Sequence, residues 1–399
     1  MREVRVGMVG AGLVSGSHAQ GYLEHSDAEI VAVCDLNREI AEWKAGMWGA
    51  RKVYTDYDEM LRDPEINAVD IMTPPYHHHA MVIKATDAGK HVNCEKPFCS
   101  SVREGKEMTR SAEKNGVILA VDESYVFTSS HMRARELIEE GAIGEPMQIR
   151  QRHGNWNQRE GEPVARRRLV EKRREGKSWR VDPVMSGGGA YPWVFDHAVH
   201  LFALARYFML DTDIELVYAL ASAYQGGGAG EVYATGDHQD VPIITWQFQG
   251  GQKQGVWMRA ERLTHTYDYR VGFSTIVLGS EGMIEVLGEG GGNLYHDGRP
   301  VHLILYRAGG EIESMRFEEG GDRVWDSEIS YYDRAHANQV AHFLDCVIGG
   351  KAPRYGGQDG TREVQVTLAA IRSAMEARPV RVSEIGEGFT AFYPDGLGG

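Results

Sequence analysis

The sequence has few cysteines and no long apolar run. Cys34, Cys94, Cys99 and Cys346 show no CxxC spacing, and the first two lie in apolar runs typical of buried strands. This pattern favours reduced thiols and a cytoplasmic protein. No stretch approaches about 18 uninterrupted apolar residues, so we expect no membrane-spanning helix. The N-terminus shows no segment of signal-peptide type.

The chain also lacks an excess of basic residues. It has 57 Asp and Glu against 43 Lys and Arg, a formal net charge of −14. Phosphate backbones and anionic lipids would repel such a protein, so we expect neither nucleic acid nor membrane as a partner. We therefore expect small molecules as the partners of this protein. The length of 399 residues, with 42% hydrophobic and 25% charged residues, predicts a globular protein of two domains.

The first third of the chain alternates short β-rich runs with helix-periodic segments. The β-rich runs cover residues 4–10, 29–35, 68–73, 91–94 and 117–121. Helix ends are marked by a capping box of Ser101 and Glu104 and by Gly89 and Gly116. This repeating βαβ pattern predicts a doubly wound parallel sheet of Rossmann type over residues 1–122.

From about residue 123 the pattern changes. One further helix, residues 130–146, precedes widely spaced strand candidates. These candidates cover residues 147–152, 214–224, 242–248, 254–263 and 274–279. Glycine-rich segments at 226–230 and 288–293 indicate loops. We expect a second α/β domain over residues 123–399, with a mostly antiparallel sheet and two closing helices. Those helices are expected at about 333–348 and 361–377.

A glycine-rich turn follows the first β-rich run. Gly10, Gly12 and the small Ser15 occupy the three positions that allow a tight turn, close approach of a pyrophosphate, and close packing of helix on strand. Asp35 stands twenty residues after Ser15, where an acid accepts hydrogen bonds from an adenosine ribose and repels a 2′-phosphate. The alternative is a solvated turn aspartate. We expect NAD; nearby Arg38 keeps NADP as an alternative.

Glu95, Lys96 and Pro97 follow the run 91–94 directly. Ligands of doubly wound sheets bind beyond the carboxyl ends of the strands, so this charge pair should face the nicotinamide end of the cofactor. Pro97 lacks an N–H and has a restricted φ, which ends the strand and orients Lys96; a cis Lys96–Pro97 bond is one way to do so. The alternative is an ordinary surface ion pair before a turn.

A second set of candidates lies in residues 186–208, where a glycine-rich loop leads into an apolar helix. Asp196 and His200 are four residues apart and share one helix face. A carboxylate beside an imidazole raises its pKa, which suits a general base acting on an alcohol; the alternative is a structural pair. Grouping Asp196, His197 and His200, or residues 77–79, gives no set of metal-ligand spacings, so we expect no metal.

Five segments, in this order, resemble the Gfo/Idh/MocA family of sugar and inositol oxidoreductases. They are GAGLVSGSH, TPPYHHHAMVIKATDAGKHVNCEKP, ELIEEGAIGEP, WRVDPVMSGGG with DHAVH, and FLDCVIGGKAPRYGGQDG. The similarity covers most of the chain, and AGKHVNCEKP is its most specific part. It implies an NAD(P)-binding Rossmann domain and an α/β domain whose open sheet forms oligomer contacts, with the active site between them. The C-terminal helices would pack back on the first domain.

The resemblance also implies roles for individual residues. Lys96, Asp196 and His200 would act on the substrate hydroxyl. The cofactor would contact the strand ends at Gly10, Gly12, Leu13, Val14, Asp35, Thr73, Pro74, His78, Glu95 and Lys96. Two departures from the family pattern matter. Val126 stands where the family often has arginine, and a longer spacing after the glycine loop leaves Trp193 and His197 as an alternative register for the catalytic pair.

A basic stretch, residues 166–180, holds eight Lys or Arg in this acidic chain. Most such runs are solvated helix faces or oligomer contacts. The alternative is a pocket wall for an anionic sugar, with Arg180 as its main residue. Arg152, His153 and Trp156 would add a polar grip and a stacking surface. The predicted substrate contacts are Lys96, Arg152, Trp156, Arg180, His197 and His200.

We therefore expect an NAD(P)-dependent dehydrogenase, a homodimer or homotetramer, that transfers a hydride between a secondary hydroxyl carbon of a cyclic sugar, glycoside or inositol and the nicotinamide. One alternative is an enzyme that recycles NAD and cleaves a glycosidic bond by transient oxidation and elimination, for example in an anionic sugar. The other is an NAD-binding sugar sensor without chemistry, against which the presence of Lys96, Asp196 and His200 argues.

Overall fold

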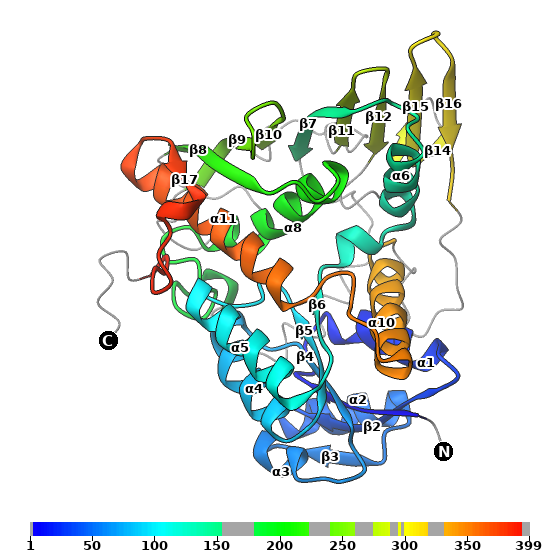
Figure 1. Ribbon diagram of the computed structural model, residues 1–399. Coiled ribbons are helices and arrows are strands. Elements are labelled where there is room, and N and C mark those ends of the chain that lie inside the picture. Colours follow the sequence, from blue (N-terminus) through cyan, green and yellow to red (C-terminus); the bar gives the residue numbers. More distant parts are fainter. Residues whose placement is uncertain are drawn as a thin grey trace, which may run out of the picture.

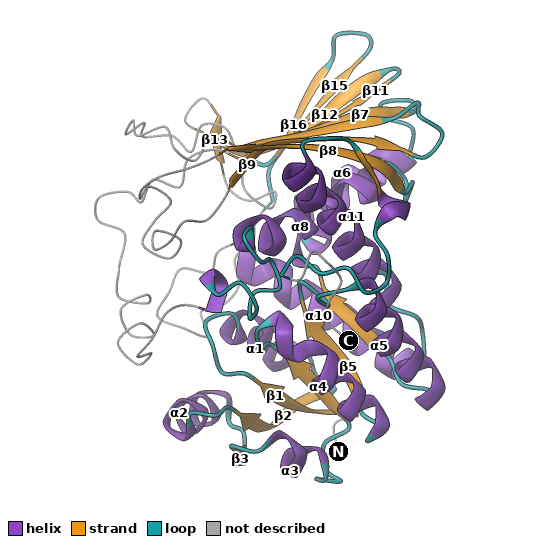
Figure 2. Ribbon diagram, turned by 90° about the vertical axis from the view of Figure 1, so that its left-hand side faces the viewer, coloured by secondary structure: helices purple, strands orange, loops and turns teal. Residues whose placement is uncertain are grey.

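Two large β-sheets with a layer of helices between them dominate the computed structural model of the chain (Figures 1 and 2). The structure describes residues 3–153, 179–222, 240–259, 274–287, 294–296, 299–317 and 331–392. One hydrophobic cluster of buried side chains extends from the first sheet through the helix layer to the second sheet. The two halves therefore share packed surface.

The first sheet is parallel and has six strands in the order β3-β2-β1-β4-β5-β6. The strands are β1 (Val4–Val9), β2 (Ala28–Cys34), β3 (Lys52–Tyr54), β4 (Ala68–Ile71), β5 (His91–Glu95) and β6 (Leu119–Asp122). The helices between them are α1 (Ser15–Glu24), α2 (Arg38–Trp48), α3 (Tyr57–Leu61), α4 (Pro75–Asp87) and α5 (Val102–Asn115). The predicted doubly wound sheet is confirmed, and its order reverses between β1 and β4, where such sheets bind ligands.

The helix ends of this half follow the sequence signals. Ser101 caps α5, since its Oγ accepts from the Glu104 N–H at 3.3 Å. The Glu104 carboxylate reaches one residue further back than expected and accepts from Ser100 N at 2.7 Å. Gly116 ends α5 in a left-handed conformation. β3 was not among the predicted runs, because three residues carry too short a pattern.

The second sheet has nine strands in the order β16-β15-β12-β11-β7-β10-β9-β8-β17. They are β7 (Pro146–His153), β8 (Ile214–Ser222), β9 (Asp240–Phe248), β10 (Gln254–Arg259), β11 (Ser274–Gly279), β12 (Gly282–Leu287), β15 (Leu303–Arg307), β16 (Ile312–Met315) and β17 (Val380–Arg381). Only β7 and β10 pair in parallel among these strands, so the mostly antiparallel sheet is confirmed. β13 (Leu294–His296) and β14 (Arg299–Val301) form a separate pair.

Helices lie on one face of the nine-stranded sheet, between it and the parallel sheet (Figure 2). They are α6 (Ser129–Glu139), α8 (Pro192–Phe208) and α11 (Gly357–Glu376). α11 begins four residues earlier than expected, because Asp359 Oδ2 accepts from Gly356 N at 3.1 Å and caps a glycine-rich first turn. Short 3-10 turns, η1 (Ser124–Phe127), η2 (Trp179–Val181) and η4 (Val382–Glu384), complete the layer.

The helix α10 (Tyr331–Gly349) packs against α1 and contacts β1, β5 and β6 of the parallel sheet (Figure 1). α11 contacts both α5 and α8. The C-terminal helices thus join the N-terminal sheet. The domain boundary after residue 122 stays a prediction; its physical basis is that β6 ends at Asp122 and the chain then leaves the parallel sheet. The glycine-rich segments 226–230 and 288–293 lie outside the described residues.

Among the helices that the structure describes, none is both long enough and apolar enough to cross a bilayer.

The contact between α1 and α10 gives a stability prediction. A Cβ on Gly21 of α1 would lie 2.6 Å from Val340 Cβ, whereas a Cβ on Gly46 of α2 meets no atom within 4 Å. Gly21→Ala should lower the free energy of unfolding by about 1–3 kcal/mol through overpacking. Gly46→Ala should raise it by about 0.5–1 kcal/mol through helix propensity. Urea unfolding measures both.

A second substitution checks the cause. If the clash with Cβ and Cγ1 of Val340 destabilises Gly21→Ala, then Val340→Gly, which removes both atoms, should cost less in that background than in the wild type. Equal costs in the two backgrounds would contradict the packing assigned to α1 and α10.

Candidate active site

The turn after β1 lies against the end of β4. Gly10 has a φ of +89°, and a Cβ there would come 2.8 Å from the carbonyl oxygen of Met72. Ser15 donates from Oγ to the carbonyl of Gly12 at 2.7 Å, which is how a small polar residue fills the third position of the turn. Leu13 is about half exposed at the tip. The backbone here suits close approach of a pyrophosphate, because no side chain can occupy the position of Gly10.

Asp35 follows β2 and lies beside this turn. Its Oδ2 accepts from Ala11 N and its Oδ1 from Asn37 N, both at 2.8 Å. Each carboxylate oxygen has a second lone pair, so both remain able to accept from ribose hydroxyls. Arg38 lies at the surface and pairs with Glu42 at 3.4 Å. The carboxylate is thus fixed at the turn, and the guanidinium is directed along α2, an arrangement that fits NAD.

His78 connects two loops at the carboxyl edge of the sheet. Its Nε2 lies 2.8 Å from the carbonyl of Thr73, after β4, and its Nδ1 lies 3.0 Å from the carbonyl of Pro97, after β5. The ring is fully buried, and burial lowers its pKa. His78 therefore braces the two loops from inside. Contact with the cofactor stays a prediction for every residue assigned to it, including Val14, Thr73 and Pro74, the last of which is the N-cap of α4.

Lys96 crosses from the parallel sheet to α8. The Lys96–Pro97 peptide bond is cis, as the sequence suggested. Lys96 Nζ donates to the carbonyl oxygen of Asp196 at 3.0 Å and to its Oδ1 at 3.2 Å, and the Lys96 side chain is only 9% exposed. The ammonium is therefore held in one place by a carboxylate of the second half, as expected for a placed cation.

Asp196 holds two cations. Its Oδ2 accepts from the Arg180 guanidinium, and His197 Nδ1 lies 3.4 Å from the same oxygen. Burial by itself raises the pKa of Asp196, but Arg180 and Lys96 outweigh burial and hold it well below its ordinary value. Asp196 is thus ionised, and its charge is taken up by Lys96 and Arg180.

His200 is paired with a residue that the sequence analysis missed. Its Nδ1 lies 2.5 Å from Oε1 of Glu123, the residue after β6, and its ring stacks on Tyr125 with 4.0 Å between centroids. The expected pairing with Asp196 is wrong, because that carboxylate binds Lys96 and Arg180. The expected rise in pKa is also wrong: burial and then Lys96 lower the pKa of His200 well below its ordinary value.

One signal in the sequence points to Glu123. It follows the β-rich run that forms β6, next to β5, and carboxyl ends of neighbouring parallel strands meet at one edge.

The alternative register for the catalytic pair, Trp193 and His197, forms an aromatic stack: Trp193 stacks on His197 with 4.2 Å between ring centroids and on Trp257 with 5.6 Å. This register puts an aromatic stack, rather than an acid, in the first position of the pair.

Only part of the predicted substrate set lies near this group. Gln151 of β7 donates to the carbonyl of Leu201 and so faces α8; Arg152, the next residue along the strand, faces the opposite side and is exposed. A substrate contact from Arg152 is therefore wrong for this arrangement. Arg180 lies at the site, but bound to Asp196 and stacked over Trp179. Trp156 and most of the basic stretch lie outside the described residues.

Comparison with known proteins identifies the family. The Gfo/Idh/MocA oxidoreductase family with an NAD-binding Rossmann fold matches residues 4–123, and the Gfo/Idh/MocA C-terminal domain matches residues 131–285. The chain belongs to the Gfo/Idh/MocA family. Its predicted family, fold class and NAD cofactor are thereby confirmed, and binding of NAD at the turn of Gly10 and at Asp35 stays a prediction.

Three similar proteins cover nearly the whole chain. Myo-inositol 2-dehydrogenase of Thermotoga maritima is 25% identical over 96% of this chain and 99% of the relative. The 2,7-anhydro-N-acetylneuraminate hydratase of Mediterraneibacter gnavus is 26% identical over 98% and 100%. The structure of levoglucosan dehydrogenase in complex with NADH and levoglucosan has a TM-score of 0.72 at 22% identity, covering 95% and 99%.

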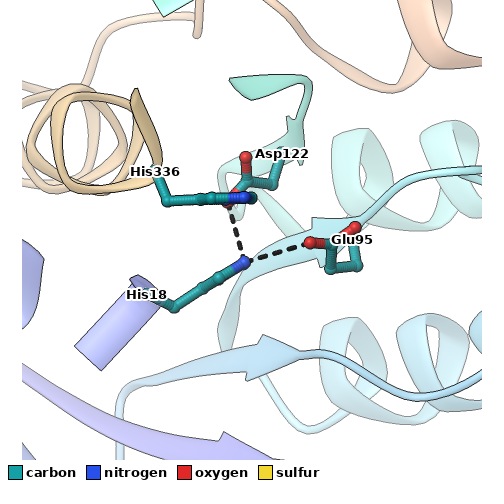
Figure 3. Close-up of side chains that lie close together, drawn as sticks. All are labelled: His18, Glu95, Asp122 and His336. Atoms are coloured by element: carbon teal, nitrogen blue, oxygen red, sulfur yellow. Dashed lines mark hydrogen bonds and ion pairs between the residues drawn. The ribbon is translucent and has the colours of Figure 1, made fainter. Parts of the chain in front are cut away.

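A buried charge network lies beneath the site in this Gfo/Idh/MocA protein (Figure 3). His18 of α1 contacts Asp70 through Nδ1 at 2.9 Å, and contacts Glu95 and Asp122 through Nε2 at 3.2 and 3.0 Å. Asp122 Oδ2 also lies 3.1 Å from His336 Nδ1 of α10. All five side chains are buried. The network fixes the carboxylate of Glu95, the residue that precedes Lys96.

The same cluster is shaped like a metal site, since one ligand atom from each of His18, Glu95, Asp122 and His336 lies within 4.8 Å of the others. Its electrostatics favour a proton instead. Burial by itself lowers the pKa of His18, but Asp70 and Asp122 raise it well above its ordinary value. With both ring nitrogens donating to carboxylates, imidazolium is the cation of the cluster. The sequence analysis did not group these residues, because they come from four separate elements.

The network predicts an acid-sensitive contribution to stability. Burial by itself raises the pKa of Glu95, but the hydrogen bond and charge of His18 lower it to about 2, from an ordinary value of 4.5. Ionised Glu95 therefore stabilises the fold above pH 4.5, by about 3 kcal/mol, and this contribution is lost as the pH falls toward 2. Urea unfolding from about pH 6 to pH 3 should show a steeper loss for wild type than for Glu95→Gln.

The matched control is Glu113→Gln, on the exposed side of α5. It should keep the wild-type slope. An equal slope in wild type and Glu95→Gln would mean that the Glu95 pKa is not depressed in the fold.

Proposed function

We propose that this chain oxidises a secondary hydroxyl of a cyclic sugar, glycoside or inositol with NAD, and catalyses the reverse reduction with NADH. The contact of Lys96 Nζ with Asp196, one helical turn from His200, carries the proposal. It puts an ammonium and an imidazole together at the carboxyl ends of β5 and β6, the edge at which this fold binds ligands. The inositol and levoglucosan dehydrogenases among its relatives support the substrate class.

Each residue has a distinct task in this proposal. His200 takes the proton of the reacting hydroxyl as general base, and Lys96 donates a hydrogen bond to the oxygen as negative charge develops on it. Asp196 fixes the position of Lys96 and balances its charge. The glycine turn and Asp35 would hold NAD, which would supply the acceptor for the hydride of the carbinol carbon. The low pKa of His200 keeps its ring neutral near pH 7, and to act as a base its substrate-facing nitrogen must also be free of a proton.

The chain's setting is also part of the proposal. Four buried free cysteines support a reducing compartment, so we place the protein in the cytoplasm. We propose a homodimer or homotetramer assembled through the face of the nine-stranded sheet opposite α6, α8 and α11. The net charge of −14 supports small-molecule partners rather than nucleic acid or membranes.

A second candidate function is cleavage of a sugar bond with recycling of NAD. The similarity to a hydratase of an acidic sugar favours it, and so does the guanidinium of Arg180 beside Asp196. The two functions share the first oxidation and differ in the products. Catalytic amounts of NAD, release of an aglycone and no accumulation of NADH select the cleavage reaction.

A substrate panel tests this function directly. The purified protein is incubated with NAD or NADP and neutral sugars, uronates, inositols and glycosides, and reduced cofactor and released aglycone are followed together. NADH formation with a neutral cyclic polyol is the expected result. Binding of NAD and a sugar without either product would instead indicate a sensor.

Lys96→Met tests the placed ammonium. Loss of the only hydrogen-bond donor assigned to the substrate oxygen should lower kcat by about 10³-fold or more, because stabilisation of developing negative charge is lost. NAD affinity, measured by protein fluorescence, should change by less than about threefold, since the glycine turn and Asp35 are untouched. Lys106→Met is the control, because Lys106 pairs with Glu387 at the surface. Near-normal turnover of Lys96→Met would remove Lys96 from the mechanism.

Asp35→Ser tests cofactor choice. The serine keeps an acceptor for the turn but removes the charge that repels a 2′-phosphate, so the NADP to NAD ratio of kcat/KM should rise at least about tenfold. Arg38→Ala in the same background should lower NADP activity if Arg38 can reach the phosphate. An unchanged ratio in Asp35→Ser would show that Asp35 does not select the cofactor.

A further inference from the structure

We propose that Glu123 positions His200, and that a single proton shared by the two side chains sets the pH range in which the chain oxidises an alcohol. The inference rests on the proposed function, in which His200 is the general base. Glu123 is a positioning residue here: it acts through the imidazole and contacts neither reacting atom.

Glu123 holds the ring from two sides. Its Oε1 lies 2.5 Å from His200 Nδ1 and also accepts from Tyr125 N at 3.3 Å. Tyr125, two residues along, stacks its own ring on the imidazole at 4.0 Å with an angle of 9° between planes. The three residues Glu123 to Tyr125 therefore fix both the hydrogen bond and the plane of the imidazole.

This arrangement leaves Nε2 for the substrate. The two nitrogens of an imidazole point in different directions, so a ring bound at Nδ1 presents Nε2 away from its partner. Glu123 and His200 come from the two halves of the molecule, from the end of β6 and from α8. Closing the fold therefore brings the base and its partner together, as it does for Lys96 and Asp196.

Stability alone does not account for the pair. A carboxyl and an imidazole, 1% and 3% exposed, both lose their hydration, and apolar side chains of similar volume would fill the space at lower cost. The nearby Asp196 is already used by Lys96 and Arg180. A second acid beside His200 is what a base needs when its ring must take up a proton and remain in place.

Charged groups from several elements surround the pair. Those acting on Glu123 or His200 are Glu95, Lys96, Asp122, Asp196 and His336, and Tyr355 and Glu363 couple to Glu123 from the α11 side. Burial raises the pKa of Glu123 to about 8, although Lys96 opposes the rise. Burial and Lys96 lower the pKa of His200 well below its ordinary value.

These directions fix where the proton lies. Below about pH 8, Glu123 is protonated and donates to Nδ1 of a neutral His200, whose own proton is then on Nε2. Above that pH the pair loses one proton: ionised Glu123 accepts from Nδ1–H, and Nε2 carries a free lone pair. Because the two groups are in direct contact, the apparent pKa of about 8 belongs to the pair rather than to either residue alone.

Oxidation needs the second state. The hydroxyl O–H bond breaks as Nε2–H forms, the carbinol C–H electron pair leaves as hydride to NAD, and a C=O bond forms. The imidazolium is stabilised by the Glu123 carboxylate until its proton passes to solvent, so the sum is alcohol plus NAD giving ketone, NADH and one proton. The oxidation rate should therefore rise with pH through about 8, and the reduction rate should fall over the same range.

Glu123→Gln tests the role, because glutamine keeps the shape and the acceptor for Nδ1–H but cannot ionise. We expect kcat for oxidation to fall about 10²-fold, the rise near pH 8 to disappear, and the Kd for NAD to stay within about twofold. Glu123→Asp should restore part of kcat and a pH-dependent rise. Glu113→Gln, on the exposed side of α5 and away from the pair, should keep the wild-type profile.

Two outcomes separate this inference from the proposed function. If His200→Asn abolishes turnover while Glu123→Gln keeps the wild-type kcat and pH profile, Glu123 has no positioning role. If His200→Asn itself turns over normally, His200 is not the base and the proposed function fails at that residue.

A measurement on the wild-type protein tests the inference even if a Glu123 variant does not fold. Nitrogen-15 NMR of labelled histidine reports the tautomer of His200, which should carry its proton on Nε2 below about pH 8 and on Nδ1 above it. One tautomer at every pH would overturn the shared-proton inference without any substitution.

Discussion

The contact between the Lys96 ammonium and Asp196 is the interaction on which the site depends. It joins the end of β5 to the first turns of α8, two elements of different sheets, and the residues are nearly excluded from water. A cation in such a place is stable only beside a fixed anion. Asp196 supplies that anion and also binds Arg180. The same contact that docks the two halves therefore aims the ammonium at the edge where the fold binds its ligands.

Charged side chains around this contact form two layers. In the upper layer, the Asp196 carboxylate pairs with the cations of Lys96 and Arg180, and Glu123 pairs with His200. Below it, the imidazolium of His18 balances carboxylates at the ends of three strands, among them Glu95. Each layer pairs opposite charges in a region of low dielectric, where an unpaired charge would be costly. Glu95 and Lys96, adjacent in the chain, belong to different layers, which explains why an acid and a base stand side by side at this strand end.

The match between expectation and structure differs from element to element. The parallel sheet was predictable, because buried parallel strands read as continuous apolar runs and glycines marked α5 and the turn at Gly10. The cis bond before Pro97 and the second sheet also followed from local pattern. β3 was too short to stand out. The strand that carries Arg152 was predicted correctly, but the face on which Arg152 lies was not. Gln151, its neighbour, faces α8, so Arg152 points to the other side of the sheet.

The sequence by itself determined the alternation of strands and helices, the glycine turn after β1 and the identity of Lys96, Asp196 and His200 as chemical groups, since these follow from local periodicity and from residue type. Only the tertiary structure decided which acid serves which partner. Asp196 and His200 share a helix face, yet Lys96 and Arg180 take up the Asp196 carboxylate and Glu123 takes the imidazole. Each carboxylate pairs with the most favourable of all the charged and polar groups that the fold brings within a few ångströms. Spacing along one helix identifies only one of those groups.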